Sequence, residues 1–162
     1  MRIRAEPLTE DAYAPYGRVI EARPGGRLVN EGMALRNDEA VDIESHRPGA
    51  KLNTCVFRCT PLPASTLDVK VLEKHPSSTQ VFIPLAAERY LVVVALGGDL
   101  PDLATLRAFV ATGRQAIAYA PGVWHHPMVG LDRETDFVAL VWEDGTEGDC
   151  VVWRGDGGIV SI

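Results

Sequence analysis

The sequence has no apolar stretch long enough to cross a membrane. Its longest nearly uninterrupted apolar run is YLVVVAL at 90–96, whereas a membrane-spanning helix needs about 20 such residues. The first residues, MRIRAEPLTEDAY, lack the apolar core and the small-residue cleavage site of a secretory signal. We therefore expect a protein of the cytoplasm that has no membrane partner.

Clusters of basic side chains are also missing. The 162 residues include 16 Lys and Arg against 22 Asp and Glu, which gives a formal net charge of −6. Nucleic-acid binding depends largely on grouped Lys and Arg side chains that displace counterions from phosphates. The charge balance therefore predicts no nucleic-acid partner.

Cysteine is scarce and odd in number, with Cys55, Cys59 and Cys150 as the only three. Thiols of cytosolic proteins are normally kept reduced, so we expect no disulfide framework. Cys55 and Cys59 are four residues apart in an alternating stretch and would share one face of a strand. Because no second Cys or His pair follows at zinc-finger spacing, we interpret them as small buried side chains.

Helical periodicity is rare, and only two short helices are predicted. One covers 9–16, where Thr9 can cap the first turn and Gly17 ends the helix; the other covers 101–106, after Asp99. The rest consists mostly of short β-branched and aromatic runs between turn residues. The predicted strands are 18–22, 52–59, 67–73, 80–84, 90–95, 106–111, 115–119, 137–142 and 150–153. Such short, regularly spaced strands predict an all-β sandwich or barrel.

The region 30–50 is polar and has no periodicity. Stretches of this length without regular structure are uncommon in compact chains and are usually functional. We expect a long loop or an arm that crosses a sheet edge. No repeat or linker divides the chain, so 1–162 is predicted to be one domain.

Glu73 and His75 form the first candidate site, within VLEKHPSSTQVF at 71–82. Residues two apart project from the same face of a strand, so the carboxylate and the imidazole would point together. Burial of this pair is costly unless it binds something. The alternative is that both side chains lie on a solvated face.

The second candidate site lies in APGVWHHP at 120–127. Pro121 and Gly122 favour a turn into a new strand. His125 and His126 are adjacent, so in an extended segment they would face opposite sides, and at most one lines an interior site. We interpret His126 as structural.

The two segments together resemble the paired motifs of the cupin superfamily. Their spacing is Glu73-x-His75-x4-Gln80 and Gly122-x-x-His125. The resemblance implies an all-β, cupin-type double-stranded β-helix, a jelly-roll barrel, with one or two short helices. If a metal binds, the resemblance makes His75, His125, Glu73 and Gln80 its ligands, although a Gln amide is a weaker, neutral oxygen donor than the carboxylate usual in cupins.

Longer strings are similar to the ureidoglycolate lyase family, called ureidoglycolate hydrolase in older usage. They cover most of the chain in the family's order, and comprise PLTEDAYAPYGRVIEA, VNEGMALR, EKHPSSTQVFIPL, YLVVVA, PDLATLRAFVATGRQ and PGVWHHPM. The stretch VWEDG at 141–145 departs from the family pattern, because many bacterial members carry Asp-Arg before a glycine there.

This resemblance implies cleavage of (S)-ureidoglycolate to glyoxylate and urea in the breakdown of purine-derived allantoin. The reaction removes a proton from a hydroxyl and supplies one to the departing nitrogen, so it needs a general base and a general acid. His75, His125 and Glu73 are the catalytic candidates, since His titrates near neutral pH, and the sequence leaves their individual roles open. The proton transfers require no cofactor, whereas the resemblance allows nickel or another divalent ion.

Other side chains are predicted to hold the substrate. A bidentate Arg suits its carboxylate, and the candidates are Arg36, in VNEGMALR, and Arg58, on a strand face compatible with an interior site; for each, the alternative is a surface charge. Gln80 offers both the donor and the acceptor that a urea group needs. Tyr119 and Trp124 are candidate contacts, or else parts of the wall or core.

Two rival functions remain open. A metal-dependent cupin enzyme could act on another small carboxylate, which needs a tight metal centre. A non-catalytic cupin could bind a carboxylate metabolite, and an attached DNA-binding segment, absent here, would favour it. In every case the partner is a small molecule, and because an uncovered sheet edge invites aggregation, we also predict a homodimer with two-fold symmetry.

Overall fold

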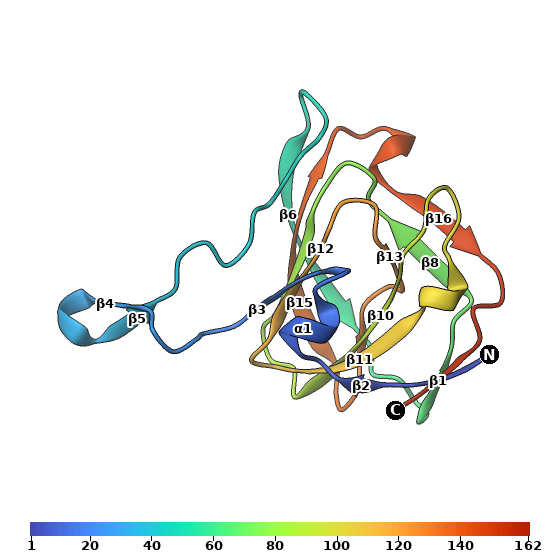
Figure 1. The fold of residues 1–162 in the computed structure, drawn as a ribbon, viewed down its shortest axis with the longest axis horizontal. Helices are drawn as coiled ribbons and strands as arrows, with labels where there is room; N and C mark the ends of the chain where they lie inside the picture. Colours follow the sequence, from blue (N-terminus) through green and yellow to red (C-terminus); the bar gives the residue numbers. More distant parts are fainter.

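Two β-sheets form the body of the barrel in a computed structural model, which describes residues 1–162 (Figure 1). One sheet has the order β3-β12-β9-β15-β6, made of Gly17–Ile20, Ala116–Tyr119, Gln80–Pro84, Thr135–Glu143 and Lys51–Cys59. The other has the order β16-β8-β13-β10-β11-β2, made of Val151–Arg154, Val71–Lys74, Trp124–His125, Arg89–Ala95, Arg107–Thr112 and Glu6–Pro7, with β14 (Val129–Gly130) also paired to β10. The all-β barrel predicted from the sequence is confirmed.

Two smaller sheets complete the structure. The first is β1-β17-β7, made of Arg2–Arg4, Ile159–Ser161 and Thr66–Asp68. The second is the hairpin of β4 (Arg27–Val29) and β5 (Ala34–Arg36), with the 3₁₀ turn η1 (Asn30–Gly32) at its tip. This hairpin projects from the barrel, and it is the most extended part of the molecule (Figure 1).

Strand β10 packs against two hydrophobic cores, one on each face. Tyr90, Val92 and Val94 belong to the core between the two main sheets, which we call the barrel core. Leu91 and Val93 belong to a second core on the outer face of the same sheet. Burial on both faces explains why 90–95 is a continuous apolar run rather than an alternating one.

Most of the longer strands agree with the sequence pattern, and 80–84 coincides with β9. The single strand predicted at 67–73 is wrong, because the chain leaves one sheet after β7 and enters another at β8. Strands of two or three residues, such as β13 and β14, are not predicted, since they are too short to show a period of two.

The predicted helices are shorter in the structure. Helix α1 covers Glu10–Tyr13, and Thr9 caps it as expected, its hydroxyl accepting a hydrogen bond from the Ala12 N–H at 3.3 Å. The helix expected at 101–106 is only a 3₁₀ turn, η2 (Leu103–Thr105), with Asp102 rather than Asp99 as its cap. A third 3₁₀ turn, η3, covers Glu147–Asp149. None of these helices has the length and apolarity to cross a membrane.

The region 30–50 is only partly the loop or arm that the sequence suggests. Its first part closes the projecting hairpin, where Asn30, Glu31 and Gly32 all have positive φ, of 53°, 57° and 88°. Asn and Gly tolerate this left-handed backbone best, which gives the Asn-x-Gly string a physical reason. Further on, the chain passes the start of the inner strand β9 rather than an edge strand, because the N–H of Thr79 donates to the Glu44 carbonyl at 3.1 Å.

Candidate active site

Glu73, His75 and His125 converge where β8 and β13 pair. The antiparallel register sets His125 opposite Glu73, and Nε2 of His125 lies 3.6 Å from a carboxylate oxygen of Glu73. The His75 and His125 rings are nearly parallel, with centroids 5.7 Å apart. One nitrogen or oxygen from each of the three side chains lies within 4.8 Å of the others. We call these three residues the polar cluster.

The hydrogen bonds of the two imidazoles fix their tautomers. Nδ1 of His75 lies 2.8 Å from the Asp149 carbonyl, and Nδ1 of His125 lies 3.0 Å from the Val123 carbonyl. A carbonyl only accepts, so each Nδ1 carries a hydrogen, and in the neutral form of the ring Nε2 keeps its lone pair. Both Nε2 atoms are buried without a hydrogen-bond partner. They are therefore available to take a proton or to bind a metal ion.

Tyr119 and Gln80 lie beside the polar cluster. The Tyr119 ring stacks on that of His125, with centroids 4.0 Å apart and planes within 7°, so it restricts how that imidazole can turn. Gln80 is opposite Tyr119 in the neighbouring strand β9, and it shares a strand face with Phe82 of the barrel core. Its buried side-chain oxygen also has no hydrogen-bond partner.

Burial and mutual charge set the protonation of the polar cluster. Burial would raise the pKa of Glu73, but the His125 imidazole beside its carboxylate and the charges of the other nearby imidazoles together lower that pKa. The pKa of His75 is lowered, first by burial and then by repulsion from His125, against the opposing effect of its bond to Asp149. At neutral pH the polar cluster thus holds an ionised carboxylate and a neutral His75.

The family model for ureidoglycolate lyase matches residues 1–158 of this chain. The chain belongs to the ureidoglycolate lyase family. Its relatives include the ureidoglycolate lyases of Pseudomonas syringae pv. tomato and Pseudomonas fluorescens, each 40% identical over 146 residues, which is 90% of this chain and 85% or 86% of the relative. A 3,4-ketoisomerase structure from Helicobacter canadensis aligns with a TM-score of 0.48 and 14% identity over 83% of this chain and 88% of its own. The sequence-based assignment to the ureidoglycolate lyases, and with it the expectation of a lyase, is confirmed.

The polar cluster fits the divalent metal that the resemblance to ureidoglycolate lyases allows. Two buried imidazole nitrogens with free lone pairs and one carboxylate lie close enough to share an ion. Imidazole nitrogen suits nickel and zinc, and the carboxylate supplies a charged oxygen. The partnerless oxygen of Gln80 would be a neutral fourth donor. These donors are the same atoms that a proton-transfer mechanism would use.

We expect the lowered pKa of His75 to appear as sensitivity to acid. Above its ordinary value of 6.5 the ring is neutral in both the folded and the unfolded chain. As the pH falls below that value the unfolded chain takes up the proton first, so the free energy of unfolding decreases until the folded ring is protonated too. An NMR titration should place the His75 midpoint below 6.5, and a midpoint at or above that value would contradict the burial described.

Cys150 is a neighbour of the polar cluster that the sequence does not reveal. Its sulfur lies 4.0 Å from a Glu73 oxygen, and burial, with help from the charge of Glu73, raises the pKa of this thiol to about 11. The thiol is therefore protonated at neutral pH and can act as a weak donor to Glu73. The contact depends on the pairing of β16 with β8, which sets Val152 opposite Glu73.

Arg47 braces the loop that bonds to His75. Its guanidinium pairs with Asp149 and, at 3.0 Å, with Asp144. The Asp149 carboxylate also accepts the N–H groups of Asp144 and Gly145 at 3.0 and 2.7 Å. The stretch that departs from the family pattern at 141–145 thus helps to hold the Asp149 carbonyl against His75.

Two predicted substrate contacts are wrong. Arg58 is exposed on the edge strand β6 and binds both carboxylate oxygens of Asp136, at 2.8 and 2.9 Å, so it does not reach an interior site. Trp124 faces the second core, where its indole N–H donates to the Gly98 carbonyl at 3.2 Å. It precedes His125 in a strand, and neighbouring side chains point to opposite faces.

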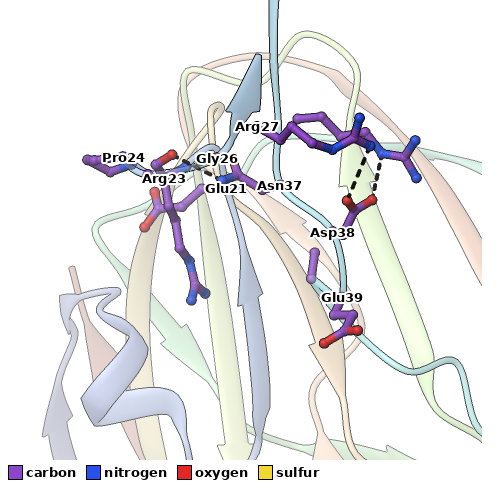
Figure 2. Close-up of a pocket in the computed structure, with 11 residues that line it drawn as sticks. Glu21, Arg23, Pro24, Gly26, Arg27, Asn37, Asp38 and Glu39 are labelled. Carbon is purple, nitrogen blue, oxygen red and sulfur yellow. Dashed lines mark hydrogen bonds and ion pairs between the residues drawn. The ribbon is translucent and has the colours of Figure 1, made fainter. Parts of the chain in front are cut away.

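Arg36, the other predicted cation, lies outside the polar cluster. It lines an open pocket of about 370 Å³ at the base of the projecting hairpin, where it pairs with Asp38 at 2.5 Å (Figure 2). Asn37 clamps this base, since its amide oxygen accepts the Arg23 N–H at 3.0 Å and its amide nitrogen donates to the Arg23 carbonyl at 3.1 Å. No residue of the polar cluster lines this pocket.

Proposed function

We propose that the polar cluster cleaves (S)-ureidoglycolate into glyoxylate and urea by acid–base elimination. A base removes the hydroxyl proton, and the electrons of the O–H bond form the new C=O bond of glyoxylate. The carbon–nitrogen bond breaks, and its electron pair leaves with the ureido nitrogen, which takes up a proton to become urea. No water is consumed, so the reaction is an elimination and not a hydrolysis.

The observation that carries this proposal is the pair of buried imidazole Nε2 atoms, neither with a hydrogen-bond partner, beside one carboxylate. His75, neutral at neutral pH, fits the base. His125 fits the acid, because the Glu73 carboxylate 3.6 Å away can balance the charge of its protonated ring. Gln80 offers an amide oxygen and N–H groups to the urea part of the substrate, and Tyr119 keeps the His125 ring in place.

The products test this proposal directly. Purified protein given (S)-ureidoglycolate should release urea and glyoxylate in equal amounts, with no ammonia. Ammonia in place of urea would mean hydrolysis of the ureido group. Binding without turnover would favour the rival carboxylate-binding function.

We expect metal removal to matter less than loss of either histidine. A divalent ion held by His75, His125 and Glu73 would act as a Lewis acid on a substrate oxygen, whereas the proton transfers proposed here use the side chains themselves. Turnover after exhaustive chelation should therefore stay above that of His75→Ala. Complete loss of turnover, fully restored by stoichiometric nickel, would instead make the histidines metal ligands first.

We also propose a homodimer. Strand β6 lies at the edge of its sheet and has one unpaired side, and the adjoining outer face exposes Leu52, Val56 and Ile83. An exposed edge strand of nine residues with apolar side chains on its outer face invites pairing with another chain. Light scattering at micromolar protein should give twice the monomer mass of 17.6 kDa, and a monomer mass would rule the dimer out.

The cytoplasm is the compartment we propose for this reaction. All three cysteines are free thiols, and Cys55 and Cys59 lie half-buried against the barrel core. Free thiols are typical of proteins kept in a reducing compartment.

A further inference from the structure

The polar cluster has no free cation for the carboxylate of its proposed substrate. Lys74, next to Glu73 in sequence, points away: its ammonium lies over the Trp124 ring, 4.6 Å from the centroid, and donates to the Gly98 carbonyl at 2.6 Å. Arg47, which touches the loop beside His75, is already paired with two carboxylates. A substrate carboxylate bound here would therefore face Glu73 with no fixed positive charge to hold it.

The projecting hairpin exposes apolar side chains that nothing in its own chain covers. Leu28, Met33 and Leu35 are 69%, 87% and 47% exposed. A two-stranded hairpin is at best marginally stable in water, and grouped exposed apolar side chains mark interaction surfaces. The hairpin therefore needs another surface to pack against.

The charge of the hairpin complements the polar cluster. Arg27 and Arg36 face each other across the two strands, and both pair with the single carboxylate of Asp38, at 3.9 and 2.5 Å (Figure 2). Asp38 balances only one of these two guanidinium groups; Glu21 and Glu39 also line the pocket but form no ion pair with either of them. An Arg guanidinium can bind a carboxylate through two parallel hydrogen bonds.

We propose that the hairpin of one copy packs against a second copy of this chain and places Arg36 in the partner's active site, where it binds the substrate carboxylate. This inference rests on the proposed function and dimer. The hairpin projects from its own barrel (Figure 1), so its apolar side chains are open to contact with a second copy. Two-fold symmetry makes the exchange reciprocal, and each site then combines the polar cluster of one copy with Arg36 of the other.

Mixed dimers test this exchange. Arg36→Ala should lower kcat/KM about ten- to hundredfold, as expected for one charge-assisted hydrogen-bonded pair, and His125→Ala should be nearly inactive. Heterodimers of the two variants, co-expressed with different affinity tags and isolated on both, should recover about half of the wild-type activity, because one of the two sites is intact. Heterodimers of His75→Ala and His125→Ala are the control and should recover nothing, since both residues belong to the same polar cluster.

Two results would overturn the exchange. If wild type is active but the Arg36→Ala and His125→Ala heterodimer stays inactive, Arg36 acts within its own copy. If Arg36→Ala alone has wild-type kcat/KM, Arg36 binds no substrate. An inactive wild type would instead mean that the proposed function has failed, and the interface is then tested separately by assembly.

Assembly gives that second measurement. Met33→Asp should raise the dimer dissociation constant at least about tenfold, because a charge replaces a buried apolar contact at the interface. Leu100→Asp is the matched control, since Leu100 is also a largely exposed apolar side chain but lies outside the hairpin, and it should leave the constant unchanged. An unchanged constant for Met33→Asp would show that the hairpin does not pack against a second copy.

Discussion

Replacing His125 with alanine is expected to lower kcat for ureidoglycolate cleavage by at least about a hundredfold, the low end of what one general acid or base contributes. His125 is buried, and its Nε2 has no partner other than the nearby Glu73. Its removal leaves the departing ureido nitrogen without a proton donor. His75→Ala should have an effect of the same size, because the hydroxyl proton then has no acceptor.

His46 provides the matched control for both substitutions. Its side chain is exposed and its only polar partner is Glu44, so His46→Ala should keep wild-type kcat. Circular dichroism and thermal unfolding would verify that the three variants are folded. Wild-type turnover in folded His125→Ala or His75→Ala would show that the polar cluster does not carry out the proton transfers.

Replacing Trp124 with alanine should produce the reverse pattern, a large loss of stability with little loss of activity. Trp124 is buried in the second core, and truncation of a buried Trp typically costs about 3–5 kcal/mol in the free energy of unfolding. Its side chain points away from the polar cluster, so turnover per folded molecule should stay within about tenfold of wild type, a smaller change than loss of one general acid or base.

Urea unfolding and kcat measured on the same samples test this contrast between neighbours in the sequence. A Trp124→Ala variant with unchanged stability but a hundredfold lower kcat would place the indole in the active site after all. A loss of stability alone would support the packing seen here.

The polar cluster is predictable from the sequence because its geometry is largely local. Glu73 and His75 share a strand face because side chains two residues apart point the same way. The same alternation places the adjacent His125 and His126 on opposite faces. Strand Gln80–Pro84 is predicted because its apolar run begins and ends at clear turn signals.

Other contacts depend on how distant segments pair. Nothing in the local pattern around Cys150 indicates that β16 lies beside β8 and brings the thiol to Glu73. The alternation of β6 shows which residues share a face with Arg58 but not that this face is the outer one. The sequence likewise marks 30–50 as unusual without showing that Arg36 lies on a hairpin that leaves the barrel.

The rate of urea release from (S)-ureidoglycolate by wild type and by Glu73→Gln tests the central claim most directly. The substitution keeps the shape of the side chain and removes the charge that balances His125. Wild type should release urea in a saturable reaction, and folded Glu73→Gln should be at least about a hundredfold slower. Equal rates for the two proteins, or no urea release by wild type above the uncatalysed rate, would contradict the claim that this polar cluster cleaves ureidoglycolate.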